Sequence, residues 1–341
     1  MSGEPLAQCI RRLALHESLE ADLVARAFGV IMRGEGSPVQ VAALLMALRV
    51  KGETAAEVAG VVTALREAMV VMPAARPDLL VDTCGTGGGT LTTFNISTAS
   101  ALLAAGLGVR VAKHGNRSFT SRSGSADVLE AMGVTIDATP SQMALTLEEA
   151  GIVFMFAPLM HPALRHVGPI RRELAVPTVM NMVGPLANPA RAGRQVVGVA
   201  ELGRLQLLAD ALVVLGTVRA MVVHGAVGMD EISPVGRTSV VEIANGSQRA
   251  WEIDPVQFGF PAIDLADIAG GDPTENAALI EAVLAGGGPP GAQAAVILNA
   301  AAAVYISDET GSYHEAVRRA RHGLAHGAGR EALARLKRAG Q

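Results

Sequence analysis

The stretch Asp82-Thr-Cys-Gly-Thr-Gly-Gly-Gly-Thr-Leu-Thr-Thr-Phe-Asn-Ile-Ser-Thr98 lies between an aliphatic run and an alanine-rich segment. This pattern predicts a β-strand, a glycine-rich turn and an α-helix that begins at about Ser97. Glycine lets the main chain approach phosphate oxygens closely, because it has no Cβ and tolerates positive φ. The positive N-terminal end of the helix would favour the same anion. The stretch therefore predicts a phosphate-binding loop, although a plain strand–turn–helix connection rich in glycine would look the same.

This glycine-rich loop does not match the common phosphate motifs. A P-loop would carry Lys and Ser or Thr directly after its last glycine, and a dinucleotide fingerprint would carry glycine where Thr90 stands. The loop is therefore a different kind of phosphate site, whose short polar side chains would bond phosphate, ribose hydroxyls or a metal-bound water. These side chains are Thr86, Thr93, Asn95, Ser97 and Thr98. Ser97 would serve equally well as the N-cap of the helix.

The composition is that of a soluble protein with a large aliphatic core. Half of the 341 residues are apolar, but only 3% are aromatic. No apolar run reaches the roughly 18 residues that a membrane span needs, and the run at residues 294–306 is interrupted by Asn299. No secretion signal is visible, and Cys9 and Cys84 form neither a disulfide framework nor a metal cluster. We expect a cytoplasmic protein that does not contact a membrane.

The charge and the aromatic content argue against a nucleic-acid-binding protein. The formal net charge is −4, whereas general nucleic-acid binding relies on a cationic surface. One Trp, two Tyr and seven Phe offer few rings on which bases could stack. A small anionic ligand stays compatible with both observations, because a local cluster of cations is enough to bind it.

Two domains are expected. Residues 1–72 contain only helical patterns, in which Ser37-Pro-Val-Gln40 and Thr54-Ala-Ala-Glu57 are capping boxes and Gly52 ends a helix. Residues 73–78 are the predicted linker, and residues 73–341 alternate short aliphatic runs with helical stretches. This alternation predicts an α/β domain with a central, mostly parallel sheet. Helices near residues 161–190 are expected to join the helical domain.

The order of the expected elements brings three loops together. Strands are expected at residues 79–83, 109–112, 152–157, 195–200 and 220–224, with a sixth candidate at 240–243. Helices are expected at residues 97–107, 125–132, 141–150, 161–174 and 205–215, and a surface loop at 284–293. Ligands of open α/β sheets bind beyond the carboxyl ends of the strands. We therefore expect residues 85–89, 113–116 and 224–231 to meet at one edge of the sheet.

These loops carry charged groups that suit a phosphorylated substrate and a metal ion. Lys113 and Arg117 would neutralise phosphate, Lys as a point charge and Arg as a two-pronged donor. His114 is a candidate acid or base, although a lone histidine in a loop is more often a hydrogen-bonded bystander. Asp230 and Glu231 would hold Mg²⁺ together with phosphate oxygens, or would simply be solvated.

Two further segments contribute candidate residues. Ser121-Arg-Ser-Gly-Ser-Ala-Asp127 extends the phosphate loop with hydroxyls, but it also begins a helix, so capping alone could explain Ser125. His161-Pro-Ala-Leu-Arg-His166 and Arg171 are expected on one helix, where residues 161, 165 and 168 share a face that 171 continues. Arg171 would bind the carboxylate of a second substrate or form a surface salt bridge.

A set of short motifs runs in order along nearly the whole chain. They are Ala47-Leu-Arg-Val-Lys-Gly-Glu-Thr54, Gly85-Thr-Gly-Gly88, Thr93-Phe-Asn-Ile-Ser-Thr98, Lys113-His-Gly-Asn-Arg-Ser118, Ser123-Gly-Ser-Ala-Asp127, Phe156-Ala-Pro158, His161-Pro-Ala163, Asn181, Gly184-Pro-Leu-Ala-Asn-Pro189, Gly228-Met-Asp-Glu231 and Gly270-Gly271. Together, in this order and spacing, they resemble the anthranilate phosphoribosyltransferase family.

The resemblance implies a glycosyltransferase of tryptophan biosynthesis. Such an enzyme transfers the 5-phosphoribosyl group from phosphoribosyl pyrophosphate (PRPP) to the amine of anthranilate and releases pyrophosphate. The family fold is a small helical domain plus an α/β domain of the nucleoside phosphorylase/phosphoribosyltransferase kind, usually in a homodimer joined through helices. The resemblance also implies Mg²⁺, two ions per subunit, as the cofactor.

The resemblance assigns roles to residues of the matching motifs. The residues implied to contact PRPP are Gly85, Gly88, Gly89, Thr93, Asn95, Ile96, Ser97, Thr98, Lys113, His114, Gly115, Asn116, Arg117, Ser118, Phe119, Thr120, Ser121 and Ser125. Those implied to contact or lie near anthranilate are Gly85, Asn116, His114, His161 and Arg171. Those implied to take Mg²⁺ are Ser97, Asp230 and Glu231. Lys113 and His114 are the catalytic candidates.

The chain departs from the family pattern at two places. Gly89-Thr90 stands where the family usually has Asp-Gly, which removes a negative charge near the expected metal–pyrophosphate site. We therefore expect weaker dependence on Mg²⁺, or less inhibition by it, than an Asp at this position would give. Pro177 stands where the family often has Arg, and we expect a looser loop at residues 181–188.

Two other functions are open on the sequence. A pyrimidine nucleoside phosphorylase has a similar fold with comparable Lys and Ser/Arg motifs, but it would use inorganic phosphate and leave Asp230 and Glu231 without a role. A non-catalytic relative would bind nucleic acid on the same scaffold, against which the acidic charge and few aromatics count. Neither alternative involves a membrane.

Overall fold

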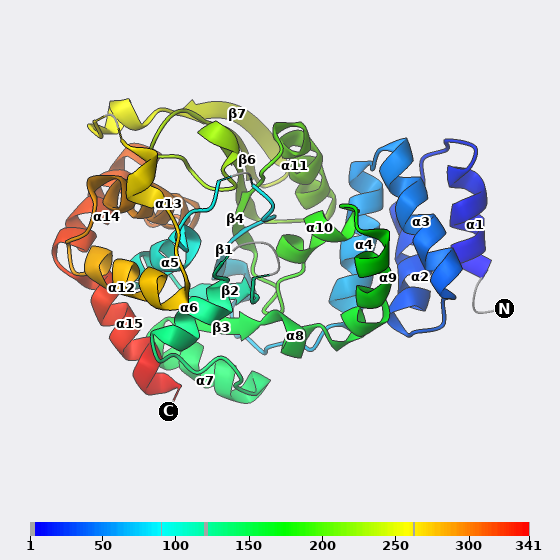
Figure 1. Cartoon of the computed structure of the whole chain (residues 1–341), viewed down its shortest axis with the longest axis horizontal. Helices are drawn as coiled ribbons and strands as arrows, with labels where there is room; N and C mark the ends of the chain where they lie inside the picture. Colours follow the sequence, from blue (N-terminus) through cyan, green and yellow to red (C-terminus); the bar gives the residue numbers. More distant parts are fainter. Residues whose placement is uncertain (1–3, 90, 119–121, 262, 341) are drawn as a thin grey trace.

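The structure is a computed structural model of the chain, and it describes residues 4–89, 91–118, 122–261 and 263–340. Thr90, Phe119, Thr120 and Ser121, which the sequence places in or beside the phosphate loop, lie outside these residues. The helices and strands fall into a bundle at the N-terminal end and a larger α/β unit built on one sheet (Figure 1). The expected fold class is confirmed.

Seven strands of the described residues form one sheet in the order β3-β2-β1-β4-β5-β6-β7. They are β1 (Val81–Gly85), β2 (Val111–Gly115), β3 (Ile152–Phe156), β4 (Arg194–Gly198), β5 (Arg219–Gly225), β6 (Thr238–Ala244) and β7 (Ser247–Ile253). The first five strands are parallel, whereas β6 and β7 are antiparallel. Gly85 pairs with Gly198 and Gly115 with Phe156, so the parallel strands end level with one another.

The six expected strands are present, within three residues of the expected bounds, and the sequence missed β7. The described helices are α1 (Glu4–Leu13), α2 (Ala21–Met32), α3 (Pro38–Lys51), α4 (Ala55–Ala68), α5 (Ile96–Gly106), α6 (Ser125–Ala131), α7 (Pro140–Ala150), α8 (Ala157–Met160), α9 (Gly168–Leu174), α10 (Met180–Val183), α11 (Leu205–Val214), α12 (Pro273–Leu284), α13 (Pro290–Ile306), α14 (Tyr313–Ala325) and α15 (Ala328–Ala339).

The capping boxes at the start of α3 and α4 are confirmed. The Ser37 hydroxyl accepts a hydrogen bond from the Gln40 amide (3.3 Å), and Gly52 ends α3 with a φ of 87°. The Thr54 hydroxyl accepts from the Glu57 amide, while the Glu57 carboxylate accepts from the Thr54 amide (2.8 Å). These local bonds satisfy amide groups that a helix N-terminus leaves free.

The helices of the N-terminal bundle do not bury all of their apolar faces against one another. Its core residues, among them Phe28 and Leu48, form one cluster with side chains of α9, α10, α11 and one face of the sheet, such as Leu208 and Val222. Figure 1 shows α9 and α10 beside α3 and α4, far from them in sequence. The helical segment therefore folds against the α/β unit, as its short amphipathic helices require.

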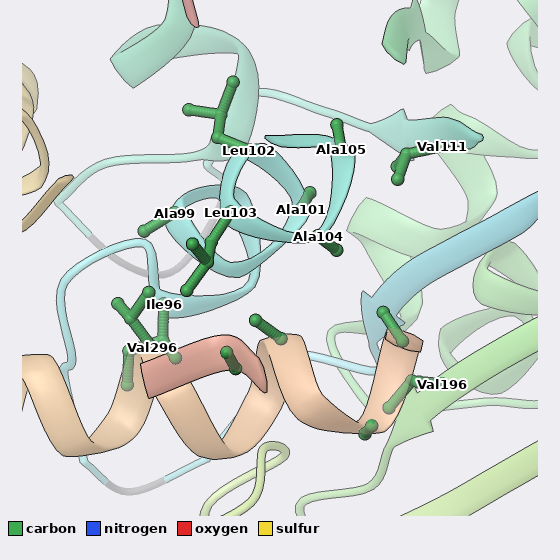
Figure 2. Close-up of a cluster of buried hydrophobic side chains, with 14 of the residues drawn as sticks. Ile96, Ala99, Ala101, Leu102, Leu103, Ala104, Ala105, Val111, Val196 and Val296 are labelled. Carbon is green, nitrogen blue, oxygen red and sulfur yellow. The ribbon is translucent and has the colours of Figure 1, made fainter. Parts of the chain in front are cut away.

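The opposite face of the sheet is covered by α5 and α13, which pack against each other with α14 and α15 behind them. Figure 2 shows why an alanine-rich sequence suits this place. Ile96 and Leu103 of α5 point toward α13 near Val296, while the small side chain of Ala105 lies on the side of Val111. No helix of the described residues is long and apolar enough to cross a membrane.

Three expectations about local structure are wrong. The helix expected at residues 161–174 is broken: residues 162–166 form a 3₁₀ turn, and α9 starts only at Gly168. The prolines at 162 and 169 explain the break, because a helix interior does not accommodate proline. The surface loop expected at 284–293 ends early, since α13 begins at Pro290. The caps of α5 and α6 are Asn95 and Gly124, so neither Ser97 nor Ser125 is an N-cap.

Candidate active site

The loops after β1 and β5 touch at the carboxyl edge of the sheet. The Gly87 amide donates a hydrogen bond to Oδ2 of Asp230 (2.8 Å). A Cβ on Gly85 or on Gly198 would collide with Asp230, so the two glycines at the ends of β1 and β4 make room for this loop. Gly87 has a φ of 68°, a conformation that glycine adopts without strain. The predicted meeting of these two loops is confirmed.

Lys113 brings the end of β2 to the same place. Its Nζ donates to the Thr83 carbonyl (2.7 Å) and lies 3.2 Å from the hydroxyl oxygen of Ser97, at the start of α5. The residue is only 3% exposed, and this burial lowers the pKa of Lys113, while the charges of Asp82 and Glu231 act in the opposite direction. We call the three joined loops, residues 85–89, 113–116 and 224–231, the rim.

The rim holds two carboxylates, Asp230 and Glu231, that lack an ion-pair partner within the described part of the chain. Among the described residues, Asp230 and Glu231 form hydrogen bonds but no ion pair, and Glu231 accepts from the Thr93 hydroxyl at 3.5 Å. The surrounding protein displaces water from both groups. This desolvation, followed by the repulsion from Asp230, raises the pKa of Glu231 to about 8. A cation at this position would be favoured strongly.

A small cavity lies between these groups. It has room of about 10 Å³ and is lined by Thr83, Ser97, Asp230, Glu231 and Asn299, among other residues. This is close to the space that a single water molecule needs. One part of its wall carries side-chain oxygens, which are the donors that Mg²⁺ prefers, whereas Cys84, Val196 and Val223 make another part apolar.

The loop after β2 is held by hydrogen bonds to the carboxylate of Asp127, which lies in α6. Asp127 accepts hydrogen bonds from the amides of Ser118 (3.1 Å) and Gly124 (2.9 Å), and Ser125 Oγ accepts from the Asn116 amide (3.2 Å). Arg117 does not point a free guanidinium at the rim: it donates to Asp127 (2.8 Å) and Glu130 (2.9 Å). A phosphate would have to compete with these two carboxylates for Arg117.

Asn95 ties the start of α5 to two other segments. Its Nδ2 donates to the Ser123 carbonyl (3.0 Å), and its Oδ1 accepts from Asn276 at the start of α12 (3.0 Å). The neighbouring Thr93 and Ala269 form an isolated β-bridge. The polar residues of the stretch at 93–98 are therefore partly structural, and only some of their oxygens are free for a ligand.

His114 of the rim faces a second buried histidine, His161. The rings of His114 and His161 lie 5.0 Å apart, the residues are 8% and 5% exposed, and neither Nε2 has a hydrogen-bond partner among the described residues. Burial lowers the pKa of His114 to about 3 and that of His161 to about 4. Both are therefore neutral near pH 7, and His114 binds a proton too weakly to be an efficient general base.

Arg171 lies on α9, which packs against α3 of the bundle. It is half-buried, burial lowers its pKa, and its described hydrogen bond is a long one to Oδ1 of Asn181 (3.4 Å). The continuous helix that would have placed Arg171 on one face with His161 does not exist. The guanidinium is nevertheless largely unpaired among the described residues, which suits a group that binds a substrate carboxylate.

The sequence did not reveal which buried residues hold the rim in place through hydrogen bonds. Asp82 is fully buried and accepts from the His114 amide (3.2 Å) and from Asn188 Nδ2 (2.8 Å). Asn188 also donates to the Ala112 carbonyl, and Asn299 bonds the backbone of Ile232. Asp82 and Asn188 stood in quoted stretches of the sequence without a role, and Asn299 was visible as the polar residue inside an apolar run.

The family models and the known proteins agree with this geometry. Residues 77–330 match the α/β domain of a glycosyl transferase family, and residues 7–69 match its helical bundle domain. An anthranilate phosphoribosyltransferase of Rubrobacter xylanophilus is 46% identical over 333 residues, which are 98% of this chain and 97% of the relative.

Solved structures give the same result. The anthranilate phosphoribosyltransferase of Thermus thermophilus has a TM-score of 0.91 and 42% identity, covering 97% of this chain and 98% of its own. The enzyme of Saccharomyces cerevisiae in complex with PRPP and Mg has a TM-score of 0.87 and 26% identity, covering 98% and 97%.

Proposed function

The chain belongs to the anthranilate phosphoribosyltransferase family, and from this premise we propose how its rim performs the reaction. The enzyme is a glycosyltransferase of tryptophan biosynthesis. It transfers the 5-phosphoribosyl group of PRPP to the amine of anthranilate, giving N-(5-phosphoribosyl)anthranilate and pyrophosphate. The observation that carries the proposal is the rim itself, where Asp230 and Glu231 line one cavity together with Ser97, and Lys113 Nζ lies 3.2 Å from the Ser97 hydroxyl oxygen.

The rim is proposed to bind the diphosphate of PRPP. The glycine-rich turn would direct its amides at phosphate oxygens, and Lys113 would supply a positive charge beside the start of α5. The proposed PRPP contacts are Gly85, Gly88, Gly89, Thr93, Asn95, Ile96, Ser97, Thr98, Lys113, His114, Gly115, Asn116, Arg117, Ser118, Phe119, Thr120, Ser121 and Ser125. Supporting geometry exists for Lys113 and Ser97, whereas Arg117 would first have to leave Asp127 and Glu130.

The donors at the rim fit magnesium. Asp230 and Glu231 are adjacent carboxylates without an ion pair among the described residues, and the raised pKa of Glu231 reflects how unfavourable its charge is without a cation. We propose Ser97, Asp230 and Glu231 as the ligands. Asp230 lies against Gly87 and Glu231 against Thr93, so the two carboxylates are available to separate ions, and we propose two Mg²⁺ per subunit. Bound Mg²⁺ would neutralise charge on the diphosphate.

Anthranilate is proposed to enter from the side of the helical bundle. Arg171 would hold its carboxylate, and Gly85, Asn116 and His161 would contact the ring or its path. A structure of the Saccharomyces cerevisiae enzyme contains 4-fluoroanthranilate, which supports an anthranilate site in this chain. The Nε2 atoms of His114 and His161, which have no partner among the described residues, give the path polar groups without charge.

The chemistry breaks the bond between C1 of the ribose and the diphosphate and forms the bond from C1 to the amine nitrogen. Positive charge develops on the sugar and negative charge on the leaving diphosphate. Lys113 and the amides of the turn are fixed before the reaction, so they stabilise the leaving group without reorganising. The aryl amine is already neutral, so its placement matters more than its deprotonation. The substrate's own carboxylate is a better proton acceptor than His114, because burial keeps the pKa of that histidine low.

We propose that Gly89, which stands where the family usually has Asp, alters how the reaction rate depends on Mg²⁺. A Cβ on Gly89 would lie 2.9 Å from the Gly228 carbonyl, so an Asp would fit only with a small shift of that loop. We expect Gly89→Asp to strengthen the dependence of the rate on Mg²⁺ or the inhibition by excess Mg²⁺. Steady-state rates over a range of Mg²⁺ concentrations test this, and an unchanged response would remove the idea.

We propose that residues 1–72, joined by helices near 161–190, form the helical domain, that residues 73–341 form the α/β domain, and that two copies associate through the bundle. The support for a dimer is an exposed apolar surface on the bundle. Leu15, Val39 and Val50 are more than two-thirds exposed, and a groove of about 290 Å³ lies beside Leu13 and Met46. A cytoplasmic location is proposed because the reaction is a biosynthetic step.

The direct test uses the fluorescence of anthranilate. The protein is mixed with anthranilate, PRPP and Mg²⁺, and each component is left out in turn. We expect fluorescence to fall only when all of them are present. Loss that requires inorganic phosphate and a nucleoside instead, or no loss at all, would contradict the proposed function.

A further inference from the structure

Asn299 lies in an unfavourable place for an amide. It sits in the middle of α13, between Leu298 and Ala300, which are both 0% exposed, and is itself 6% exposed. A buried amide destabilises a protein unless its donors and acceptor find partners. Its position inside an apolar helix therefore calls for a specific reason.

The hydrogen bonds of Asn299 provide that reason. Its Oδ1 accepts from the Ile232 amide (2.9 Å), and its Nδ2 donates to the Ile232 carbonyl (2.8 Å) and to the Ala295 carbonyl (2.9 Å). Asn299 thus satisfies both backbone groups of Ile232, as a neighbouring strand would. An aspartate lacks the donor and a serine is too short to make both bonds.

Ile232 is the residue that directly follows the two carboxylates of the rim. Asp230 and Glu231 are adjacent in the chain and both line the same cavity. If the backbone of this loop were not held, the carboxylates of Asp230 and Glu231 would turn toward water. On one side Asp230 is held by the Gly87 amide, and on the other Ile232 is held by Asn299. Asn299 also lines the cavity with Asp230 and Glu231.

We propose that Asn299 is a positioning residue for the divalent-cation site. By fixing the backbone at Ile232, it keeps the carboxylates of Asp230 and Glu231 directed at the cavity in spite of their repulsion, and so sets the affinity of the rim for the cation. This role rests on the proposed function, in which the two carboxylates bind the metal. Groups that orient a metal ligand typically change metal affinity about 10- to 100-fold when they are removed.

The test compares a variant that loses the three hydrogen bonds of Asn299 with a variant that loses a different buried hydrogen bond to α13. Asn299→Leu keeps a similar volume and removes both bonds to Ile232. Tyr313→Phe is the matched control, because the Tyr313 hydroxyl donates to the Leu298 carbonyl (2.9 Å) and does not contact the rim. Asn299→Ala is the second variant if Asn299→Leu fails to fold, since it leaves space for water at Ile232.

Two measurements are made on the full-length protein without anthranilate. Mn²⁺ is titrated alone and followed by electron paramagnetic resonance, and the exchange of the Ile232 amide with deuterium is followed in parallel. We expect Mn²⁺ affinity to fall about 10- to 100-fold in Asn299→Leu, with faster exchange at Ile232. Tyr313→Phe should match the wild type in both.

The outcomes separate the positioning role from the metal role on which it depends. Unchanged Mn²⁺ affinity in the Asn299 variants, or an equal loss in Tyr313→Phe, would overturn the positioning role while the metal role stands. Wild-type Mn²⁺ binding that Glu231→Gln does not weaken would instead overturn the metal role itself, and the positioning role with it.

Discussion

Two buried lysines show how differently the bundle and the rim treat charge. In the bundle, Lys51 Nζ lies 3.0 Å from the Glu57 carboxylate, which in turn caps α4. At the rim, Lys113 donates to a carbonyl and approaches a hydroxyl oxygen, and its charge is met by Asp82 and Glu231 only from beyond ion-pair distance. The bundle neutralises its charges locally, whereas the rim leaves them available to a charged ligand. Stability and function are therefore expected to depend on different residues.

The largest effects on activity and on stability are expected when Lys113 and Lys51 are each replaced by Met. Lys113→Met should lower kcat about 100- to 1,000-fold, because a preorganised charge at the leaving diphosphate is lost. Lys51→Met should leave kcat unchanged but lower the free energy of unfolding by about 3–5 kcal/mol, because it strands the buried Glu57 carboxylate. Steady-state kinetics and urea unfolding of both variants measure this. Similar losses of kcat in the two folded proteins would break the comparison.

The apolar core of the bundle is expected to affect stability alone. Leu48 is 0% exposed, so Leu48→Ala should lower the free energy of unfolding by about 2–5 kcal/mol through lost burial and the cavity left behind. The activity per folded molecule should stay at the wild-type value. A large drop in kcat/KM at a temperature where the variant is folded would show that the bundle also shapes the acceptor site.

Low pH is expected to destabilise the fold through the buried pair His114 and His161. His114 and His161 have folded pKa values of about 3 and 4, below the usual 6.5, so the unfolded chain takes up protons first as the pH falls. Their contribution is complete above pH 6.5, and about 2 kcal/mol for each histidine is lost by about pH 5. The raised pKa of Glu231 acts in the opposite direction over the same range, so the histidine contribution is read from the difference between wild type and a histidine variant in urea unfolding near pH 7 and pH 5.

Two substitutions test whether the buried histidines cause the loss of stability at low pH. His161→Phe should remove about half of the loss, whereas replacing the exposed His16 of the bundle by Ala should leave it unchanged. An identical pH dependence in the wild type and His161→Phe would show that the buried histidine pair is not the cause of the acid effect.

The smallest effect concerns a local cap in the bundle. The Thr54 hydroxyl accepts from the Glu57 amide at the start of α4. Thr54→Ala should lower the free energy of unfolding by about 1 kcal/mol, seen as a lower Tm in a thermal melt, with unchanged kinetics. Thr54→Ser is the conservative control and should recover most of the difference.

The sequence predicted best what depends on neighbouring residues. Capping boxes and aliphatic runs located the bundle, the parallel strands and the convergence of two rim loops, because those signals are local. The strand β7 was missed because most of its side chains are exposed and polar, so no apolar run marks it. The helix expected at 161–174 is broken because Pro162 and Pro169 each begin a new helical turn.

The supporting contacts of the site were beyond the sequence. Asp82 and Asn188 are 106 positions apart, and nothing near either residue indicates that they bond. The partners of Arg117 were likewise unforeseen, since Asp127 and Glu130 become its neighbours only when α6 folds back onto the loop. Asn299 was visible as an anomaly, but only the structure shows that Ile232 is its partner.

A crystal structure with PRPP and Mn²⁺ would test most directly whether the charges left open at the rim bind the leaving diphosphate. The account predicts an anomalous peak in contact with the carboxylates of Asp230 or Glu231, and diphosphate density between that peak and Lys113. Diphosphate bound away from Lys113, or a metal that touches no carboxylate of the rim, would contradict it.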